Sequence, residues 1–401
     1  MAKTEKVPLP ELRDRALNLQ NTLKEKGLDG ALIAQRADTY YYSGTAQNLH
    51  VYIPREGDPL VMVYRDFEKA KAESGWKVRQ LERMSGIPGY VREAGFLAPE
   101  NIGLELDVLP VNQYENYRRI FPGAVFTDIS GEIRLQRAVK SPWEIDRLKV
   151  SARIQAEMTE YAGEIISPGM TEVELEAQLV CKNRMLGHGG NVSMRGFNSV
   201  YYVGAVTSGD RATVGGYFDG PVIGSGTSVA HSLGASNTRI QPGETILIDL
   251  GTIFDGYQVD QTRTFCIGYV PDELRKAYDT AAEIEERIRR ALVPGRQAGD
   301  IYEEIIAWVR ESTPYEQNFM GYGSRRVRFF GHGVGLDLDE LPTISKGSPV
   351  ILKPGMVLAI EPKFVFPGAG AVGVEDTVVV AGESGAEFIT MSPRELTVIK
   401  A

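Results

Sequence analysis

Residues 241–249 read QPGETILID, and residues 353–361 repeat the pattern as KPGMVLAIE. Each stretch combines a Pro-Gly turn, a β-prone apolar run and an acid seven residues after the proline, Asp249 in the first stretch and Glu361 in the second. An acid at the end of an apolar strand is costly to bury unless it is paired or ligates a metal. The repeat therefore predicts two equivalent strands that each deliver a carboxylate to a special site.

A second pair of segments repeats in the same order. Residues 167–175 read SPGMTEVEL and residues 293–301 read VPGRQAGDI, and in each case a Pro-Gly turn is placed to open a helix. In the first copy Thr171 and Glu174 have the spacing of a capping box. A single Pro-Gly turn is common before a helix or a strand and is weak evidence for a repeat. Two matches in one order predict a duplicated fold with a pseudo-twofold site between its halves.

The first third of the chain alternates helix and strand signals. Leucine and alanine recur at helical spacing over residues 12–23, and residues 30–34, 60–64 and 102–106 are typical of buried strands. This alternation predicts an α/β layer domain. It contains no recognisable catalytic constellation.

A domain boundary is predicted near residue 138. A chain of 401 residues is too long for one ordinary core. Ser141 and Pro142 are suited to the N-cap and first position of a long helix. We therefore expect an N-terminal domain over residues 1–138 and a second α/β domain, the duplicated one, over residues 139–401.

The composition argues against some classes of binding partner. The chain is 43% hydrophobic and 24% charged, as in globular proteins, and its net charge of −9 argues against nucleic acid or an anionic membrane. No apolar run reaches membrane-spanning length, and the charged start, residues 1–6, lacks the apolar core of a signal peptide. A cytoplasmic location is the expectation.

Turn chemistry relates the first two acids. The Asp-Gly pair at residues 255–256 is a strong two-residue hairpin signal. Counting back along that hairpin sets Gly251 opposite Asp260, and Asp249 then points to the same face of the sheet. Two acids so close repel each other, and a divalent cation removes that cost.

The second two acids are harder to relate. Glu361 and Glu375 flank a turn at residues 367–370, and simple counting does not put both on one face. We therefore expect a bulge or a loop that adjusts the register.

A histidine lies between the two repeats. His332 sits in residues 331–335, GHGVG, where glycines let the backbone approach other groups closely. A lone histidine is often a core residue bonded to a carbonyl, but this one has four acids to join. The mixed oxygen and nitrogen set suits two divalent ions such as manganese, cobalt, iron or zinc. Two ions about 3.5–4 Å apart can deprotonate a shared water and polarise a carbonyl, which predicts hydrolysis of an amide or related bond.

Taken together, these motifs resemble the metallopeptidase family of prolidase, aminopeptidase P and methionine aminopeptidase, with creatinase as a metal-free relative on the same fold. The resemblance rests on residues 248–251, 255–257, 260–265, 331–336, 360–362 and 374–377. It extends more weakly to the N-terminal domain, whose presence fits prolidase, aminopeptidase P and creatinase better than methionine aminopeptidase.

The resemblance implies a "pita-bread" catalytic domain with a dinuclear site. The implied ligands are Asp249, Asp260, His332, Glu361 and Glu375. Asp260 and Glu375 would bridge the ions, and Glu361 would also be the general base for the bridging water. His231 matches the family histidine that contacts substrate or stabilises the tetrahedral intermediate.

Two positions depart from the family. Prolidase-like enzymes carry a second histidine seven residues after the metal histidine, where this chain has Asp339. Xaa-Pro enzymes often have arginine two residues before the last glutamate, where this chain has Gly373. An ionised acid cannot donate to an oxyanion. We hypothesise that Asp339 faces the pocket and selects a cationic group, or replaces the histidine by retaining a proton.

Three functions follow from these patterns. The first is a dinuclear metallopeptidase for Xaa-Pro or related short peptides. The second is a metal-dependent hydrolase or lyase for a small nitrogenous or zwitterionic metabolite, which Asp339 and Gly373 favour. The third, a non-catalytic binding module, gives no reason for four clustered acids. The family resemblance also implies a homodimer.

Overall fold

The structure is a computed structural model that describes residues 4–197, 199 and 204–401. Within these residues the chain forms two compact units, one from the described parts of Lys3–Arg137 and Arg195–Ser199, the other from those of Ala138–Met194 and Val200–Ala401. The elements of the first part of the chain are α1 (Leu9–Glu25), β1 (Gly30–Ile33), α2 (Arg36–Ser43), β2 (Leu49–Pro54), β3 (Leu60–Val63), α3 (Phe67–Glu73), β4 (Val78–Gln80), η1 (Met84–Gly86), α4 (Ile87–Glu93), β5 (Asn101–Leu104), α5 (Val111–Ile120), β6 (Val125–Asp128) and α6 (Ser130–Ala138).

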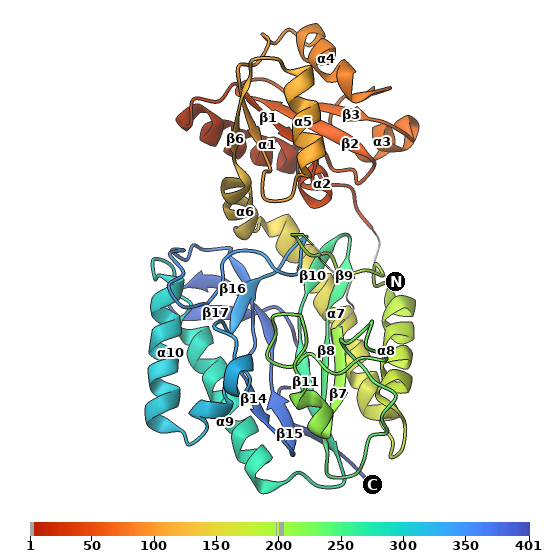
Figure 1. Cartoon of the computed structure of the whole chain (residues 1–401), viewed down its shortest axis with the longest axis vertical. Helices are drawn as coiled ribbons and strands as arrows, with labels where there is room; N and C mark the ends of the chain where they lie inside the picture. The colour runs from red at the N-terminus through yellow and green to blue at the C-terminus, as the bar shows by residue number, and fades with distance from the viewer. Residues whose placement is uncertain (1–3, 198, 200–203) are drawn as a thin grey trace. The chain divides into compact units, whose positions relative to one another are not determined.

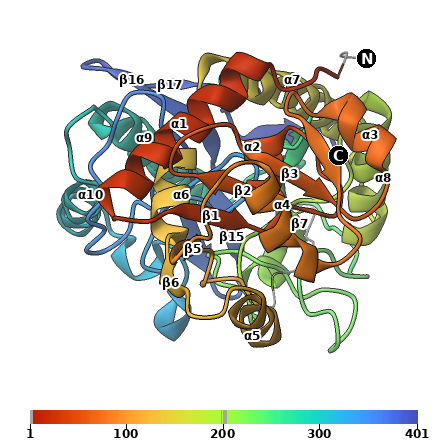
Figure 2. The same ribbon diagram turned by 90° about the horizontal axis from the view of Figure 1, so that it is seen from above.

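The first unit is a mixed sheet with helices on its faces. Its strands run in the order β4-β3-β2-β1-β5-β6, with β1 antiparallel to β2 and parallel to β5. Leu32, Tyr52 and Met62 face α4 and α5 across a buried cluster. Residues that alternate with these face the other way, where α1 lies against β1 and β2 (Figure 2). The strands predicted from the sequence correspond to β1, β3 and β5.

The second unit contains the duplicated segment. Its elements are α7 (Pro142–Ile165), α8 (Glu172–Leu186), β7 (Gly204–Ser208), η2 (Gly209–Thr213), β8 (Thr245–Leu250), β9 (Thr252–Phe254), β10 (Tyr257–Val259), β11 (Thr262–Ile267), α9 (Asp272–Ala291), α10 (Ala298–Ser312), η3 (Glu316–Asn318), η4 (Gly323–Arg325), β12 (Gly331–Gly333), β13 (Val357–Ile360), β14 (Lys363–Phe366), β15 (Gly370–Gly373), β16 (Asp376–Gly382), β17 (Gly385–Phe388) and β18 (Thr397–Ile399).

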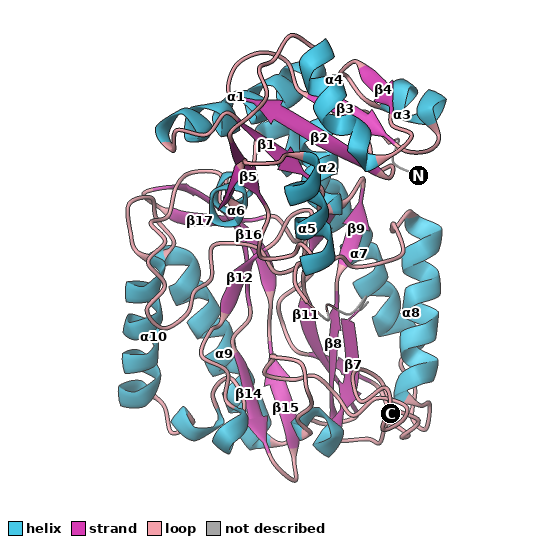
Figure 3. Ribbon diagram, turned by 45° about the horizontal axis from the view of Figure 1, so that its top comes forward, coloured by secondary structure: helices cyan, strands magenta, loops and turns pink. Residues whose placement is uncertain are grey.

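Each half of this unit packs a helix pair on a four-stranded sheet. In the first half α7 and α8 bury apolar residues against the sheet β18-β11-β8-β7. In the second half α9 and α10 do the same against β12-β13-β16-β17. Figures 1 and 3 show the strands of this unit between α7 and α8 on one side and α9 and α10 on the other. This arrangement confirms the predicted duplicated α/β fold.

The local signals read from the sequence lie where they were expected. Ser141 begins α7 with a capping box to Glu144, and Thr171 begins α8 with one to Glu174. In the second half α10 follows the equivalent Pro-Gly turn. Among the described residues, none of the helices combines the length and apolar character needed to cross a bilayer.

Candidate metal centre

A tight hairpin positions the first two acids. β9 and β10 pair around Asp255 and Gly256, whose φ angles of 49° and 85° are the positive values that a two-residue turn of this kind needs. The same register, continued one residue beyond the ladder, sets Gly251 opposite Asp260. Asp249 lies two residues before Gly251, so both carboxylates project from one face, in agreement with the prediction.

The second two acids oppose each other directly. The ladder of β13 with β16 and the ladder of β14 with β15 keep one register, which places Lys363 opposite Gly373 and, between the ladders, Glu361 opposite Glu375. Neither ladder contains a bulge, and of the two expected possibilities, a bulge or a loop, the loop sets the register. The connection between the paired ends of β14 and β15 has three residues, 367–369, and this odd number keeps both acids on one face.

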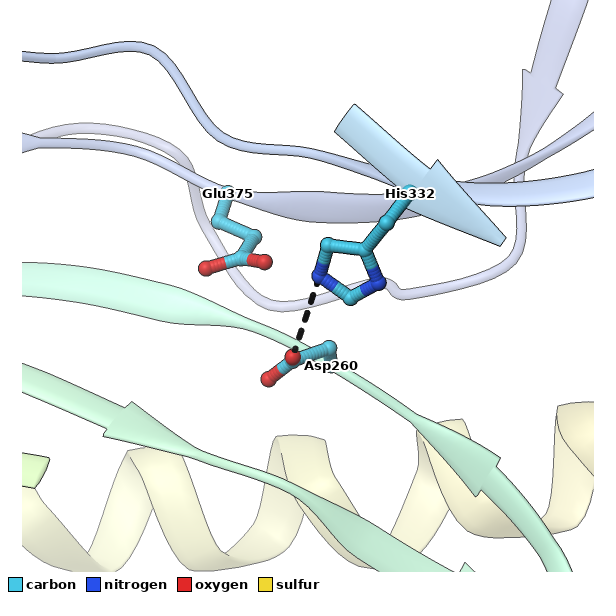
Figure 4. A group of neighbouring side chains, drawn as sticks. All are labelled: Asp260, His332 and Glu375. Carbon is cyan, nitrogen blue, oxygen red and sulfur yellow. Dashed lines mark ion pairs between the residues drawn. The ribbon is translucent and has the colours of Figure 1, made fainter. Parts of the chain in front are cut away.

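His332 points from the short strand β12 toward these acids. Its Nε2 atom lies 3.8 Å from Asp260 Oδ2 and 4.0 Å from Glu361 Oε1. Figure 4 shows His332 reaching toward Asp260 with Glu375 beside it. The flanking Gly333 is required by close approach, because a Cβ there would lie 2.2 Å from a backbone carbonyl oxygen. Glycine beside this histidine is therefore needed for steric reasons.

A lysine that the sequence reasoning missed lies inside the cluster. Lys363 Nζ donates to Asp249 Oδ2 at 3.0 Å, to Glu361 Oε2 at 2.7 Å and to Glu375 Oε2 at 2.9 Å. The side chain is 1% exposed. An ammonium group has three N–H donors, and each of them has a carboxylate partner here. The signal for it was available, since a strand places residues 361 and 363 on the same face.

Threonines of the two halves hold the acids in place. Thr262 Oγ1 donates to Glu375 Oε2 at 2.7 Å. Thr377 Oγ1 accepts from the Asp260 backbone N–H at 2.9 Å and donates to the Asp260 carbonyl at 2.9 Å. Each threonine thus links an element of one half to an acid of the other half. Their contribution is to fix the register in which the four carboxylates meet.

Burial and mutual repulsion raise the pKa values of the acids. Burial raises the pKa of Asp260 well above its ordinary value, and the nearby charges of Glu375 and Asp249 raise it further. Burial also raises the pKa of Asp249, against the lowering influence of Lys363. When all four acids are ionised, the cluster carries more negative charge than the lysine alone neutralises, and the raised pKa values reflect this excess.

The same acids stabilise the charged forms of the two bases. Burial would lower the pKa of His332, but the surrounding acids, Asp339 first among them, outweigh it and raise that pKa to about 9. Burial likewise opposes the charge of Lys363, and the three carboxylates that it touches hold its pKa well above the ordinary value. The site is a strong attractor for cations.

The cluster lies in the wall of a cavity of about 320 Å³. The remainder of the wall combines apolar side chains, Phe218 and Phe329 among them, with two further acids, Asp219 and Asp339. Asp339 is the exposed tip of a loop closed by backbone hydrogen bonds between Gly333 and Glu340. The structure thus places Asp339 at the pocket, as hypothesised.

The described residues that line the cavity do not include His231. Its side chain is exposed, and its backbone forms a bridge with that of Ser228. Its predicted contact with substrate stays a prediction.

One divalent ion fits the donors on the histidine side of the cluster. Asp260, His332 and Glu375 each offer a ligand atom, and these atoms all lie within 4.8 Å of one another. Ligand distances of about 2.0–2.2 Å allow two ligand atoms of one ion to lie up to about 4.4 Å apart, and His332 Nε2 and Asp260 Oδ2, 3.8 Å apart, are within that range. Asp249 contacts the Lys363 ammonium instead, on the opposite side.

Comparison with known proteins gives one family over most of the chain. The sequence pattern of metallopeptidase family M24 matches residues 146–382, and that of the Creatinase/Prolidase N-terminal domain matches residues 15–139. Both matched ranges agree with the family resemblance of the motifs. The first match contains every residue of the cluster.

Individual relatives match over nearly their whole length. An Xaa-Pro dipeptidase of Pyrococcus furiosus is 28% identical, with 96% of this chain and 100% of the relative covered. The solved structure of an Xaa-Pro dipeptidase from Bacillus anthracis has a TM-score of 0.82 at 26% identity, covering 97% of this chain and 100% of that one. A prolidase from Pyrococcus horikoshii OT3 has a TM-score of 0.80 at 25% identity, covering 96% and 99%.

Proposed function

Because this chain belongs to metallopeptidase family M24, we propose that it is a metal-dependent peptidase that cleaves short peptides with proline after the scissile bond. The observation that carries the proposal is the buried cluster of four carboxylates and His332 in the wall of a peptide-sized cavity. The full-length similarity to proteins named Xaa-Pro dipeptidase supports it. It also favours a peptidase over the predicted alternative, a hydrolase or lyase for a small metabolite.

We assign the metal ligands as the resemblance implies them: Asp249, Asp260, His332, Glu361 and Glu375. A divalent ion of the manganese, cobalt, iron or zinc class would supply Lewis acidity here, activating water and polarising the scissile carbonyl. Glu361 is the proposed general base. Its Oε2 accepts from Lys363, which leaves Oε1, the atom nearer His332, free to take a proton. The expectation of two ions remains a prediction, and Lys363 bears directly on it.

The cavity wall suggests how a peptide is chosen. Phe218 and Phe329 offer an apolar surface suited to a pyrrolidine ring, and Asp219 and Asp339 suit a cationic end or side chain. Among the described residues that line the cavity none is arginine or lysine. We therefore propose that Asp339 selects peptides with a positive group near the scissile bond, and that a free C-terminal carboxylate is not held by an ion pair.

The test is a substrate screen on metal-loaded protein. Manganese-loaded and cobalt-loaded samples are assayed against Xaa-Pro dipeptides, the same dipeptides amidated at the C-terminus, longer Xaa-Pro peptides and matched Xaa-Ala peptides. We expect cleavage before proline and little cleavage of the Xaa-Ala series. Hydrolysis of neither series by fully loaded protein would reject the peptidase assignment.

The domain division, the oligomeric state and the location of the protein are also proposed. We propose residues 1–138 and 139–401 as the two domains, a division supported by the separate family matches. A homodimer and a cytoplasmic location are the expected states. Sedimentation analysis and localisation of a tagged full-length chain would test them.

A further inference from the structure

The Lys363 ammonium group occupies a position that a metal ion would otherwise take. It is enclosed by Asp249, Glu361 and Glu375 at 2.7–3.0 Å, and the side chain is buried. All three carboxylates are proposed metal ligands. A cation of fixed position is therefore already present on the Asp249 side of the cluster.

We infer that Lys363 replaces one of the two metal ions, so that the site holds a single divalent ion on the His332 side. The inference rests on the metal site proposed above. It assigns the ion to Asp260, His332 and Glu375, whose donor atoms lie within 4.8 Å of one another. Glu361 faces this place with Oε1 and faces Lys363 with Oε2.

The opposite strand is shaped to accept the lysine. Gly373 lies opposite Lys363 in the β14–β15 ladder. A Cβ at residue 373 would lie 2.5 Å from Lys363 Cγ and 2.9 Å from the Pro362 carbonyl oxygen. Real Cβ atoms do not approach so closely, so a larger residue at position 373 would displace the lysine stem. Glycine at this position, already noted as a departure from the family, is thus coupled to the lysine.

A second divalent ion does not fit beside this ammonium. Lys363 Nζ lies 3.0 Å from Asp249 Oδ2, so an ion bound to that oxygen would stand beside the ammonium group. Like charges this close repel strongly in a buried site. Displacing the lysine would break three hydrogen bonds, because each of its N–H groups is bonded to a cluster acid. A single divalent ion also nearly balances the charge of the site. Four ionised carboxylates, one ammonium group and one divalent ion together leave a single negative charge.

Metal stoichiometry tests the inference directly. Full-length protein is stripped with a chelator, equilibrated with excess Mn²⁺ by dialysis, and the bound manganese per chain is measured by mass spectrometry. We expect one ion in the natural protein and two in Lys363→Ala, which vacates the Asp249 side. Lys140→Ala is the matched control, because Lys140 is another buried lysine but pairs with Glu340 outside the cluster. We expect it to keep one ion.

Manganese spectroscopy gives a second readout. A low-temperature paramagnetic resonance spectrum of the natural protein should show an isolated ion, and Lys363→Ala should show two coupled ions. If Lys363→Ala does not fold, anomalous diffraction from Mn²⁺-soaked crystals of the natural protein replaces it, with one peak expected per chain.

Two ions in the natural protein, or one ion in folded Lys363→Ala, would overturn the inference. These outcomes are separable from the fate of the proposed function. A protein that binds one ion and cleaves no Xaa-Pro peptide removes the peptidase assignment and leaves the lysine assignment intact. A protein that binds two ions and cleaves such peptides does the reverse.

Discussion

The two halves of the second unit carry equivalent acids and differ two residues further along each strand. Asp249 is followed by Gly251, which lines the cavity and carries no side chain. Glu361 is followed at the same distance by Lys363, whose ammonium group is buried among the acids. A duplicated backbone can therefore keep its ligand positions while one residue changes which cation the ligands hold.

The largest expected effect comes from removing an acid that both halves support. Asp260 lies opposite Gly251, its backbone N–H donates to Thr377 Oγ1 of the other half and its carbonyl accepts from the same hydroxyl, and its side chain faces His332. We expect Asp260→Asn to abolish metal binding and peptidase activity, because the amide removes a charged ligand. Calorimetric titration with Mn²⁺ and an Xaa-Pro assay measure both.

The matched control for that variant is Asp279→Asn, on the exposed face of α9. It removes one negative charge without touching the cluster, so metal affinity and activity should be unchanged. Full activity in Asp260→Asn would show that the equivalence of the two halves has no bearing on catalysis.

Replacing Lys363 tests the difference between the two halves, namely a buried lysine in the second half where the first half has Gly251. In metal-free buffer Lys363→Met leaves buried carboxylates without their cation, and we expect a loss of about 3–5 kcal/mol in the free energy of unfolding. Excess Mn²⁺ should restore part of that loss. Urea unfolding with and without metal is the measurement.

Lys140→Met provides the contrast for this experiment. It also breaks a buried ion pair, with Glu340, and should destabilise the chain by a comparable amount. Metal should not rescue it beyond the stabilisation that the natural protein gains. Equal rescue of both variants would mean that Lys363 is an ordinary structural lysine.

Alanine at the two glycines that lie opposite cluster residues, Gly373 across from Lys363 and Gly251 across from Asp260, gives a comparison with smaller expected effects. In Gly373→Ala the new Cβ meets Lys363 Cγ at 2.5 Å, and we expect a loss of about 1–3 kcal/mol. In Gly251→Ala the nearest atom is Val192 Cγ2 at 3.3 Å, and the loss should be under about 1 kcal/mol. Denaturant unfolding in a chelating buffer measures both.

A double variant identifies the cause. If the cost of Gly373→Ala arises from the lysine stem, adding Lys363→Ala should remove most of the alanine penalty. Additive losses would instead assign the strain to the Pro362 carbonyl and uncouple the two positions.

Local chemistry explains what the sequence predicted well. The Pro-Gly repeats, the Asp-Gly turn and the capping signals each act within a few residues, and they were sufficient to predict the duplicated fold and the face shared by Asp249 and Asp260. The pairing of Glu361 with Glu375 depends on the length of one loop, residues 367–369, which composition does not determine.

Lys363 was missed for a different reason. A lysine in a strand is ordinarily an exposed residue, and burial is favourable here only because three acids from two halves of the chain surround it. Burial of Lys363 also depends on Gly373, which lies opposite it in the ladder. From the sequence, Gly373 was noted only as a glycine where Xaa-Pro enzymes often have arginine. The roles of single residues could be predicted from the sequence, whereas the coupling of Lys363 with Gly373 on the opposite strand became visible only in the structure.

The smallest expected effect concerns a residue with no counterpart in the repeat. Asp339 lines the cavity at an exposed loop tip and contributes to the raised pKa of His332. We expect Asp339→His to reduce the preference for Lys-Pro over Glu-Pro, measured as a ratio of kcat/KM, by about fivefold, the size of an exposed charge pair. Because exposed charges are screened, the natural preference should also weaken between low and high salt. A ratio that is unchanged in the variant and insensitive to salt would separate Asp339 from selectivity and leave substrate choice to the apolar wall of the cavity.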